Sequence, residues 1–157
     1  ILNANVEFNM LYGPAYKGIT LAASTAIAMS GFNRNVPFAF NRKEAKDHGE
    51  GGQTIGAPVS GKVLIIDDVI SAGTSVRESI EVIESAGASP CGIVVSLDRQ
   101  ERGTGPESAI QQIQRDFALP VISLFCLDDL LDYLSDRPEM AENLSLVRRY
   151  REKYGAD

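Results

Sequence analysis

The sequence predicts an α/β fold with an open, mostly parallel, twisted sheet flanked by helices. Short apolar runs alternate with longer amphipathic stretches along the chain, which is the pattern of strands that alternate with helices. One run, Val63–Ile66, is wholly aliphatic, as expected of a parallel strand that is buried on both faces. The 157 residues show no repeat or low-complexity segment, so we expect residues 1–157 to form a single domain.

The first half of the chain is expected to contribute three strands and one helix. Val6–Leu11 alternates apolar and polar residues and leads into a Gly-Pro turn signal, which predicts a strand. Lys17–Ser30 is rich in Ala, Ile, Leu and Met and ends before a glycine, so it is predicted to be a buried helix. Apolar runs predict the other two strands at Val36–Phe40 and Val63–Ile66.

The second half is expected to contain four helices and two strands. Ser75 and Glu78 have the spacing of a capping box, and apolar residues follow at helical spacing as far as Gly87. The same two patterns predict the remaining strands, Gly92–Leu97 and Val121–Phe125, and the remaining helices, Pro106–Phe117, Leu127–Leu134 and Glu139–Tyr154.

Charge and cysteine content exclude several classes of protein. The net charge is −6, so the chain lacks the cationic surface that charge-driven nucleic-acid binding needs. It contains neither an apolar run long enough to cross a membrane nor a secretion signal. Cys91 and Cys126 are far apart in the sequence and are expected to be reduced core residues. We therefore expect a cytoplasmic protein that binds neither nucleic acid nor membrane.

The segment from Asp67 to Ser75 is the strongest candidate for a ligand site. A buried strand brings two adjacent carboxylates to its end, and a loop of small and hydroxyl residues then leads into a helix. Small residues let backbone N–H groups approach an anion, and the helix N-terminus adds positive potential. The carboxylates suit sugar hydroxyls or hydrated Mg²⁺, so the segment predicts a site for a ribose 5-phosphate. The residues of this site are Asp67, Asp68, Val69, Ile70, Ser71, Ala72, Gly73, Thr74 and Ser75.

A second acid pair, Asp128-Asp129, serves as a comparison. It also follows a predicted strand, but Leu130-Leu131 come directly after it and no loop of small residues is present. We expect this pair to begin a helix, with its charges near the positive end of the helix dipole.

The stretch Asn41–Gln53 has no apolar periodicity and ends in a glycine-rich run. It contains several cations and the only histidine of the chain, His48. A solvated loop is one interpretation of such a stretch. The other is a mobile loop that closes over a polyanion and excludes water.

His48-Gly49-Glu50 and Pro90-Cys91 match parts of the zinc deaminase signature. The signature also needs a second cysteine three residues after the first, where this chain has Val94.

Three segments resemble the type I phosphoribosyltransferases, and above all the members of that family that act on orotate. Val63–Ser75 is similar to the family's phosphoribosyl pyrophosphate motif, and Phe40–Gly52 to the mobile loop of the bacterial orotate enzymes. Gly13–Gly18 is the third match. The similarity extends from about Leu11 to the segment Tyr150–Gly155, which is most of the chain.

The resemblance implies a reaction in which orotate N1 is joined to ribose C1 and Mg²⁺-bound pyrophosphate leaves. It implies that Asp67 and Asp68 bind the ribose hydroxyls and that Ser71 to Ser75 surround the 5′-phosphate. It further implies that Mg²⁺ is held mainly through substrate and water. The other residues that the resemblance places on substrate are Tyr16 and Lys17 at the pyrophosphate, Arg42, Lys43, Lys46 and His48 of the loop, and Arg99 at the orotate carboxylate.

Within that list, the resemblance assigns catalytic roles to Lys46 and His48 beside the two aspartates. It also implies a homodimer in which Arg42, Lys46 and His48 reach the neighbouring subunit, whereas Lys43 serves its own. The fork of Arg99 suits a carboxylate, although a surface ion pair with Glu101 or Asp98 is the alternative.

Two features depart from the family pattern. Ser71 stands where the motif normally has Thr, and serine retains the hydroxyl group. Residues 1–8 do not match the N-terminal segment that covers the base in the family, so we expect this chain to be the core without that hood. A phosphoribosyltransferase for another base and a non-catalytic sensor of phosphoribosyl pyrophosphate stay open as alternatives.

Overall fold

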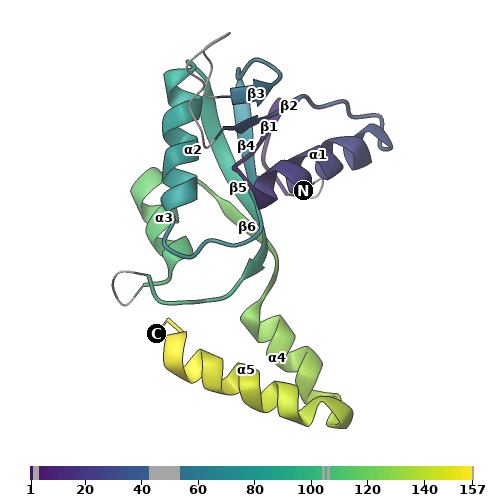
Figure 1. The fold of residues 1–157 in the computed structure, drawn as a ribbon, viewed down its shortest axis with the longest axis vertical. Coiled ribbons are helices and arrows are strands. Elements are labelled where there is room, and N and C mark those ends of the chain that lie inside the picture. Colours follow the sequence, from purple (N-terminus) through teal and green to yellow (C-terminus); the bar gives the residue numbers. More distant parts are fainter. Residues whose placement is uncertain (2–3, 43–53, 104, 106, 157) are drawn as a thin grey trace.

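The computed structural model describes residues 1, 4–42, 54–103, 105 and 107–156. Their strands form one six-stranded sheet in the order β3-β2-β1-β4-β5-β6 (Figure 1). All neighbouring strands are parallel except β2 and β3, which are antiparallel. The strands are β1 (Met10–Gly13), β2 (Phe38–Asn41), β3 (Thr54–Gly56), β4 (Lys62–Asp67), β5 (Ser89–Asp98) and β6 (Val121–Cys126). The helices are α1 (Lys17–Ser30), α2 (Thr74–Ser85), α3 (Ala109–Phe117), α4 (Leu127–Ser135) and α5 (Ala141–Tyr154), with a 3₁₀ turn at Pro138–Met140.

Helices cover both faces of the sheet, as the aliphatic run in β4 predicts. Val63 and Ile65 pack in one core with residues of α2 and α3, whereas Leu64 and Ile66 pack in a second core with residues of α1. All four side chains are buried. A strand that needs apolar residues at every position is therefore the central strand of a three-layer α/β fold, and the predicted fold class is confirmed.

The strand order places a topological switch point between β1 and β4. The chain runs from β1 to β2 through α1 on one face, and from β4 to β5 through α2 on the other. Open α/β sheets bind ligands in the crevice outside the carboxyl ends of the strands at such a point. The segments that follow Gly13 and Asp67 flank this crevice.

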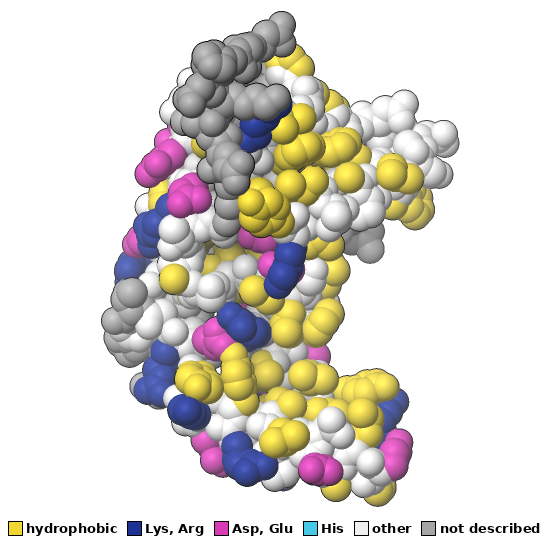
Figure 2. Space-filling model, in the orientation of Figure 1, with side chains coloured by type: hydrophobic (Ala, Val, Ile, Leu, Met, Phe, Trp, Pro, Cys, Tyr) yellow, Lys and Arg dark blue, Asp and Glu magenta, His cyan; other side chains and the backbone are white. Residues whose placement is uncertain are grey.

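The last two helices form a hairpin beyond the edge strand β6, separate from the two layers that cover the sheet (Figure 1). The end of α5 returns to the main body, where the Ala156 amide donates to the Gln100 carbonyl at 2.8 Å. Apolar side chains remain at the surface of this region, including Leu124, Tyr133 and Leu146 (Figure 2). The hairpin is thus fastened to the rest of the chain at both of its ends.

Several predicted boundaries are wrong. The first strand is β1, four residues later in the chain than Val6, and the short strand β3 was not predicted. Helix α2 begins after Gly73, so Ser75 lies inside the helix and forms no capping box. A capping box is present instead at α3, where Ser108 and Gln111 exchange hydrogen bonds.

The loop predicted at 41–53 is only partly described. Asn41 is the last residue of β2 and therefore belongs to the sheet, and Arg42 directly follows it. Residues 43–53 lie outside the described part of the chain. Both cysteines are free, as expected, but they are half-buried rather than core residues. In the described part of the chain, no helix has the length and apolar character to cross a membrane.

Candidate active site

Three segments meet at the carboxyl ends of β1, β2 and β4. They are the turn after β1, the end residue of β2 and the predicted segment Asp67–Ser75. Gly18 makes the close approach possible, since a Cβ there would lie 2.8 Å from the Ile66 carbonyl oxygen. The start of α1 consequently lies against the end of β4, and it carries Lys17 toward the acid pair.

A cavity of about 280 Å³ lies between these segments. Its floor includes the start of α2, whose first turn presents backbone N–H groups that have no partner within the helix. Gly73 precedes the helix with φ +74°, a left-handed conformation that glycine adopts without strain. The lining residues are Pro14, Ala15, Asn41, Ser71, Ala72, Gly73, Thr74, Ser75 and Glu78. The cavity therefore has the size, donors and dipole of a site for a phosphate group.

Asp67 connects this cavity to the acid pair. Its carboxylate accepts hydrogen bonds from the Asp68 amide at 2.8 Å and from the Ser75 hydroxyl at 3.2 Å, and only 8% of the residue is exposed. Burial raises the pKa of Asp67, although the two hydrogen bonds oppose the shift. The result is a carboxylate held rigidly at the end of β4 and linked to the wall of the cavity.

Asp68 is more exposed and has a cationic partner. Its carboxylate lies 2.5 Å from the Lys17 ammonium group. Burial alone raises the pKa of Asp68, but the hydrogen bond and charge of Lys17, together with the Val69 amide, bring it below the ordinary value. Asp68 is consequently charged at neutral pH, whereas Lys17 gives up this partner if it turns to an anionic ligand.

Asn41 belongs to the site although the sequence did not indicate it. Its side-chain oxygen accepts a hydrogen bond of 2.7 Å from the Ala15 amide, 26 positions away in the sequence. This bond ties the end of β2 to the turn after β1. Glu78, which is exposed and lines the same cavity from α2, was also missed. A lone Asn at a strand end carries no local signal, so only the sheet order brings it to the site.

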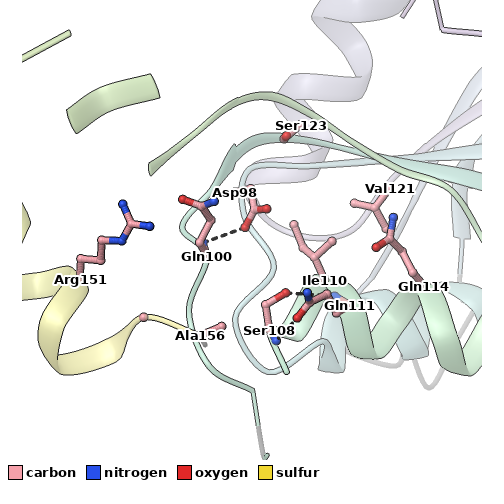
Figure 3. Close-up of a pocket in the computed structure, with 11 residues that line it drawn as sticks. Asp98, Gln100, Ser108, Ile110, Gln111, Gln114, Val121, Ser123, Arg151 and Ala156 are labelled. Carbon is pink, nitrogen blue, oxygen red and sulfur yellow. Dashed lines mark hydrogen bonds between the residues drawn. The ribbon is translucent and has the colours of Figure 1, made fainter. Parts of the chain in front are cut away.

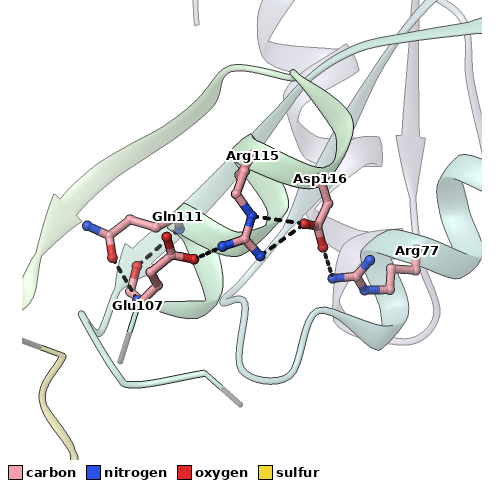
Figure 4. A network of polar contacts seen from close by, with 6 residues as sticks. Arg77, Glu107, Gln111, Arg115 and Asp116 are labelled. Atoms are coloured by element: carbon pink, nitrogen blue, oxygen red, sulfur yellow. Dashed lines mark hydrogen bonds and ion pairs between the residues drawn. The ribbon is translucent and has the colours of Figure 1, made fainter. Parts of the chain in front are cut away.

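A polar network supports the site from behind (Figure 4). Arg77 of α2 donates to Asp116 of α3 at 2.7 Å, and Arg115 bridges Asp116 and Glu107. Ile113 of α3 packs so closely below the cavity that a Cβ on Gly73 would lie 2.9 Å from its side chain. Helix α3 therefore holds the loop between β4 and α2 in place.

Arg99 forms the ion pair that the sequence analysis kept as an alternative. Its guanidinium lies 2.8 Å from the Glu101 carboxylate. The Nε–H group of Arg99 is buried and has no hydrogen-bond partner among the described residues. The side chain is thus held on one side by Glu101, and 31% of it stays exposed.

The other predicted residues fall into three groups. Tyr16 and Arg42 are exposed beside the crevice, with 68% of Tyr16 accessible. Ile70 is buried in the core, so only its backbone can serve a ligand. The predicted loop residues Lys43, Lys46 and His48 lie outside the described residues.

The acid pair fits Mg²⁺ held largely by substrate and water. Among the described residues, no group of three or more His, Cys, Asp and Glu gathers as a metal cage. Mg²⁺ is typically bound in phosphate sites by one or two carboxylates, several waters and the substrate's own oxygens. Asp67 and Asp68 supply such carboxylates at the edge of the cavity.

Comparisons with known proteins agree with this geometry. The family model described as phosphoribosyl transferase domain matches residues 1–118. An orotate phosphoribosyltransferase of Chromobacterium violaceum is 58% identical over 157 residues, which cover all of this chain and 73% of the relative.

Two solved structures have the same fold. A crystal structure of an orotate phosphoribosyltransferase of Francisella tularensis superposes with a TM-score of 0.82 at 35% identity, covering 99% of this chain and 75% of the other. The Mycobacterium tuberculosis enzyme in complex with 5-phospho-alpha-D-ribosyl 1-diphosphate has a TM-score of 0.66 at 22% identity, with 82% and 69% covered. At that identity the second likeness shows the fold alone.

Proposed function

The chain belongs to the phosphoribosyltransferase family and, within it, to the orotate phosphoribosyltransferases. We propose that it binds phosphoribosyl pyrophosphate through Asp67–Ser75. The reaction transfers the phosphoribosyl group to orotate, releases pyrophosphate and gives orotidine 5′-monophosphate in pyrimidine biosynthesis. The family match sets aside the zinc deaminase, and the 58% identity to orotate phosphoribosyltransferases favours orotate over another base and an enzyme over a non-catalytic sensor.

The observation that carries the binding proposal is the link between the phosphate-sized cavity and the acid pair. Ser75 lines the cavity and donates to Asp67, so both parts belong to one rigid unit. In the proposal, the amides and hydroxyls of Ser71 to Ser75 hold the 5′-phosphate. Asp67 and Asp68 then accept hydrogen bonds from the ribose hydroxyls, which fixes the sugar with C1 toward the crevice.

In the transfer step, the bond from C1 to the pyrophosphate oxygen breaks, the bond from C1 to orotate N1 forms, and the proton on N1 passes to the leaving pyrophosphate or to water. Positive charge develops on the ribose ring and negative charge on the leaving group. We propose that Lys17 leaves Asp68 and neutralises the pyrophosphate, beside Tyr16 and the loop residues Arg42, Lys43, Lys46 and His48. A preorganised donor of this kind is worth about 10²–10³ in rate. Mg²⁺ would be held near Asp67 and Asp68 through substrate and water and would neutralise further charge on the leaving pyrophosphate.

Arg99 is proposed to bind the orotate carboxylate. It lies directly after β5, which neighbours β4 in the sheet, so the base would approach the sugar from this side. The Arg99 side chain is 31% exposed, so the assignment is supported by guanidinium N–H groups that a bidentate carboxylate can reach. A cytoplasmic location and a homodimer with the 41–53 loop acting between subunits stay predictions.

Calorimetric titration with phosphoribosyl pyrophosphate, with and without Mg²⁺, tests the donor site. We expect saturable binding that Thr74→Val weakens about tenfold, because a hydrogen bond to a charged group is lost. Thr25→Val on α1 is the matched control and should bind like the unsubstituted chain. Equal affinity of all three proteins would refute the assignment of the cavity to the 5′-phosphate.

A further inference from the structure

The residue after Arg99 has contacts that neither the sequence nor the proposed reaction explains. We propose that Gln100 is a positioning residue that sets Arg99 for the carboxylate of the base. The inference deepens the proposed function, because it rests on the contact between Arg99 and orotate.

Gln100 is held by its backbone in an uncommon conformation. Its φ is +51°, in the left-handed region that residues other than glycine rarely adopt. Its amide donates to the Asp98 carboxylate at 2.8 Å, which closes a tight turn around Arg99 (Figure 3). The direction in which Arg99 leaves the backbone is therefore set by its two neighbours.

Both polar atoms of the Gln100 side-chain amide form hydrogen bonds with Asp128. Its Nε2 donates to the Asp128 carboxylate at 2.9 Å, and its Oε1 accepts from the Asp128 backbone amide at 3.1 Å. Asp128 is the second residue of α4, and Arg151 of α5 donates to the other oxygen of its carboxylate. A reciprocal pair of this kind fixes the turn relative to the helical hairpin in distance and in orientation.

The end of the chain adds backbone bonds to the same turn. The Ala156 amide donates to the Gln100 carbonyl at 2.8 Å, and the Arg102 amide donates to the Tyr154 carbonyl at 2.9 Å. A cavity of about 390 Å³ lies on the far side of these contacts and is lined by Asp98, Gln100, Ser108 and Arg151 among others (Figure 3). The turn is thus not packed on all sides and depends on its polar contacts for its position.

The position of Arg99 matters because a bidentate contact with a carboxylate requires two N–H groups to be placed accurately. Misplacement of a binding group by about 1 Å can cost on the order of 10²-fold in rate. Glu101 fixes only one side of the Arg99 guanidinium. In our proposal Gln100 supplies the remaining constraint through the backbone.

A pair of matched nucleotides tests the inference without requiring turnover. Orotidine 5′-monophosphate and uridine 5′-monophosphate differ only by the carboxylate, so the ratio of their dissociation constants measures that group alone. We expect the unsubstituted chain to prefer orotidine 5′-monophosphate, and Arg99→Ala to lower the preference about tenfold or more, as a charged hydrogen bond is lost. Absence of any preference in the unsubstituted chain would reject the proposed role of Arg99, independently of Gln100.

Gln100→Leu, which keeps the size but removes both hydrogen bonds, is expected to reduce the preference about fivefold, with affinity for phosphoribosyl pyrophosphate unchanged. Gln114→Leu is the matched control, because Gln114 lines the same cavity from α3 and has no hydrogen bond to the turn in the described residues. Gln100→Asn tolerates the left-handed backbone better but cannot reach Asp128, so it should behave like Gln100→Leu.

A double-mutant cycle separates positioning from a general structural role. In the Arg99→Ala background, Gln100→Leu is expected to change the preference no further. An unchanged preference in Gln100→Leu would overturn the inference. The same holds for an equal loss with and without Arg99, or for a loss of affinity for both nucleotides and for phosphoribosyl pyrophosphate together.

Discussion

Asp67-Asp68 and Asp128-Asp129 are the same dipeptide at the ends of two strands of one sheet, but the structure that follows each pair is different. After β4, five residues separate the acids from α2, and the loop that they form encloses a cavity. After β6, the acids are themselves the first turn of α4, and Asp129 accepts a hydrogen bond from the Cys126 amide at 2.7 Å. In our proposal, the loop of small residues rather than the acid pair distinguishes the ligand site from a helix cap.

Asp67 and Asp129, one carboxyl of each pair, have pKa values that shift in opposite directions because the carboxyls have different surroundings. Burial raises the pKa of Asp67, whose neighbours are the core and the cavity wall. The Cys126 amide lowers the pKa of Asp129, which lies at the surface. Burial of the charge on Asp67 therefore costs folding free energy, which ligand binding can offset. The charge on Asp129 instead stabilises the folded chain.

The largest expected effect is the loss of affinity for phosphoribosyl pyrophosphate when the first pair, Asp67-Asp68, is changed. Asp67→Asn with Asp68→Asn should weaken binding of phosphoribosyl pyrophosphate by about 10² or more, because two charge-assisted contacts to the ribose are lost. The matched double change Asp128→Asn with Asp129→Asn should leave that affinity intact. Calorimetric titration of both proteins decides the matter, and similar losses in the two would remove the functional distinction between the pairs.

The loop can be tested apart from the acids. Gly73 and Gly87 have similar left-handed φ values of +74° and +76°, so alanine should cost each about 1–2 kcal/mol of stability. Only at Gly73 does a Cβ also meet a neighbour, the Ile113 side chain at 2.9 Å. We expect Gly73→Ala to lower donor affinity several-fold and to lower Tm more than Gly87→Ala does, because of the added contact with Ile113. Gly87→Ala should leave donor affinity unchanged. Equal affinities would mean that the loop conformation does not form the phosphate site.

Asp67 and Asp129 should also affect stability with opposite signs. Since the pKa of Asp67 is raised in the folded state, its charge lowers stability above the raised pKa and has no effect below the ordinary value of 3.8. The lowered pKa of Asp129 does the reverse: stability is present above 3.8 and is lost as the pH falls through the lowered value. Asp67→Asn should thus raise the free energy of unfolding at neutral pH, and Asp129→Asn should lower it.

Urea unfolding at about pH 7 and about pH 3 measures both effects, and both differences from the unsubstituted chain should shrink at the lower pH. A destabilised Asp67→Asn at neutral pH would show that the hydrogen bonds of Asp67 outweigh the cost of burying its charge.

Features of the two acid pairs could be predicted from the sequence where the signal lies in neighbouring residues. Strand, acid pair, small residues and helix follow one another in Val63–Ser75, so the position of the site at a strand end could be predicted. The spacing of a capping box occurs at both Ser75 and Ser108, however, and only Ser108 forms one. At α2 the turn places Gly73 before the helix, which moves Ser75 inside and frees its hydroxyl for Asp67.

The contacts that the sequence could not indicate all join distant segments. Asn41 bonds to Ala15, and Gln100 bonds to Asp128 across 28 positions. Neither pair has a recognisable spacing, because each depends on which strands are neighbours. The strand β3 was missed for a different reason: its three residues are too few to show alternation.

The smallest effect is expected from the cations that accompany the two pairs. The Lys17 side chain is 75% exposed and the Arg151 side chain 48%, so Lys17→Met and Arg151→Met should each change stability by no more than about 1 kcal/mol. Lys17→Met should nevertheless raise the pKa of Asp68, because burial then acts on this carboxyl without the opposing ammonium group. Titration of the Asp68 carboxyl by NMR checks the shift, with Arg151→Met as the control in which it should not move. An unshifted Asp68 in Lys17→Met would mean that the Val69 amide, not Lys17, keeps this carboxylate charged, and Lys17 would then be free for pyrophosphate without first leaving a partner.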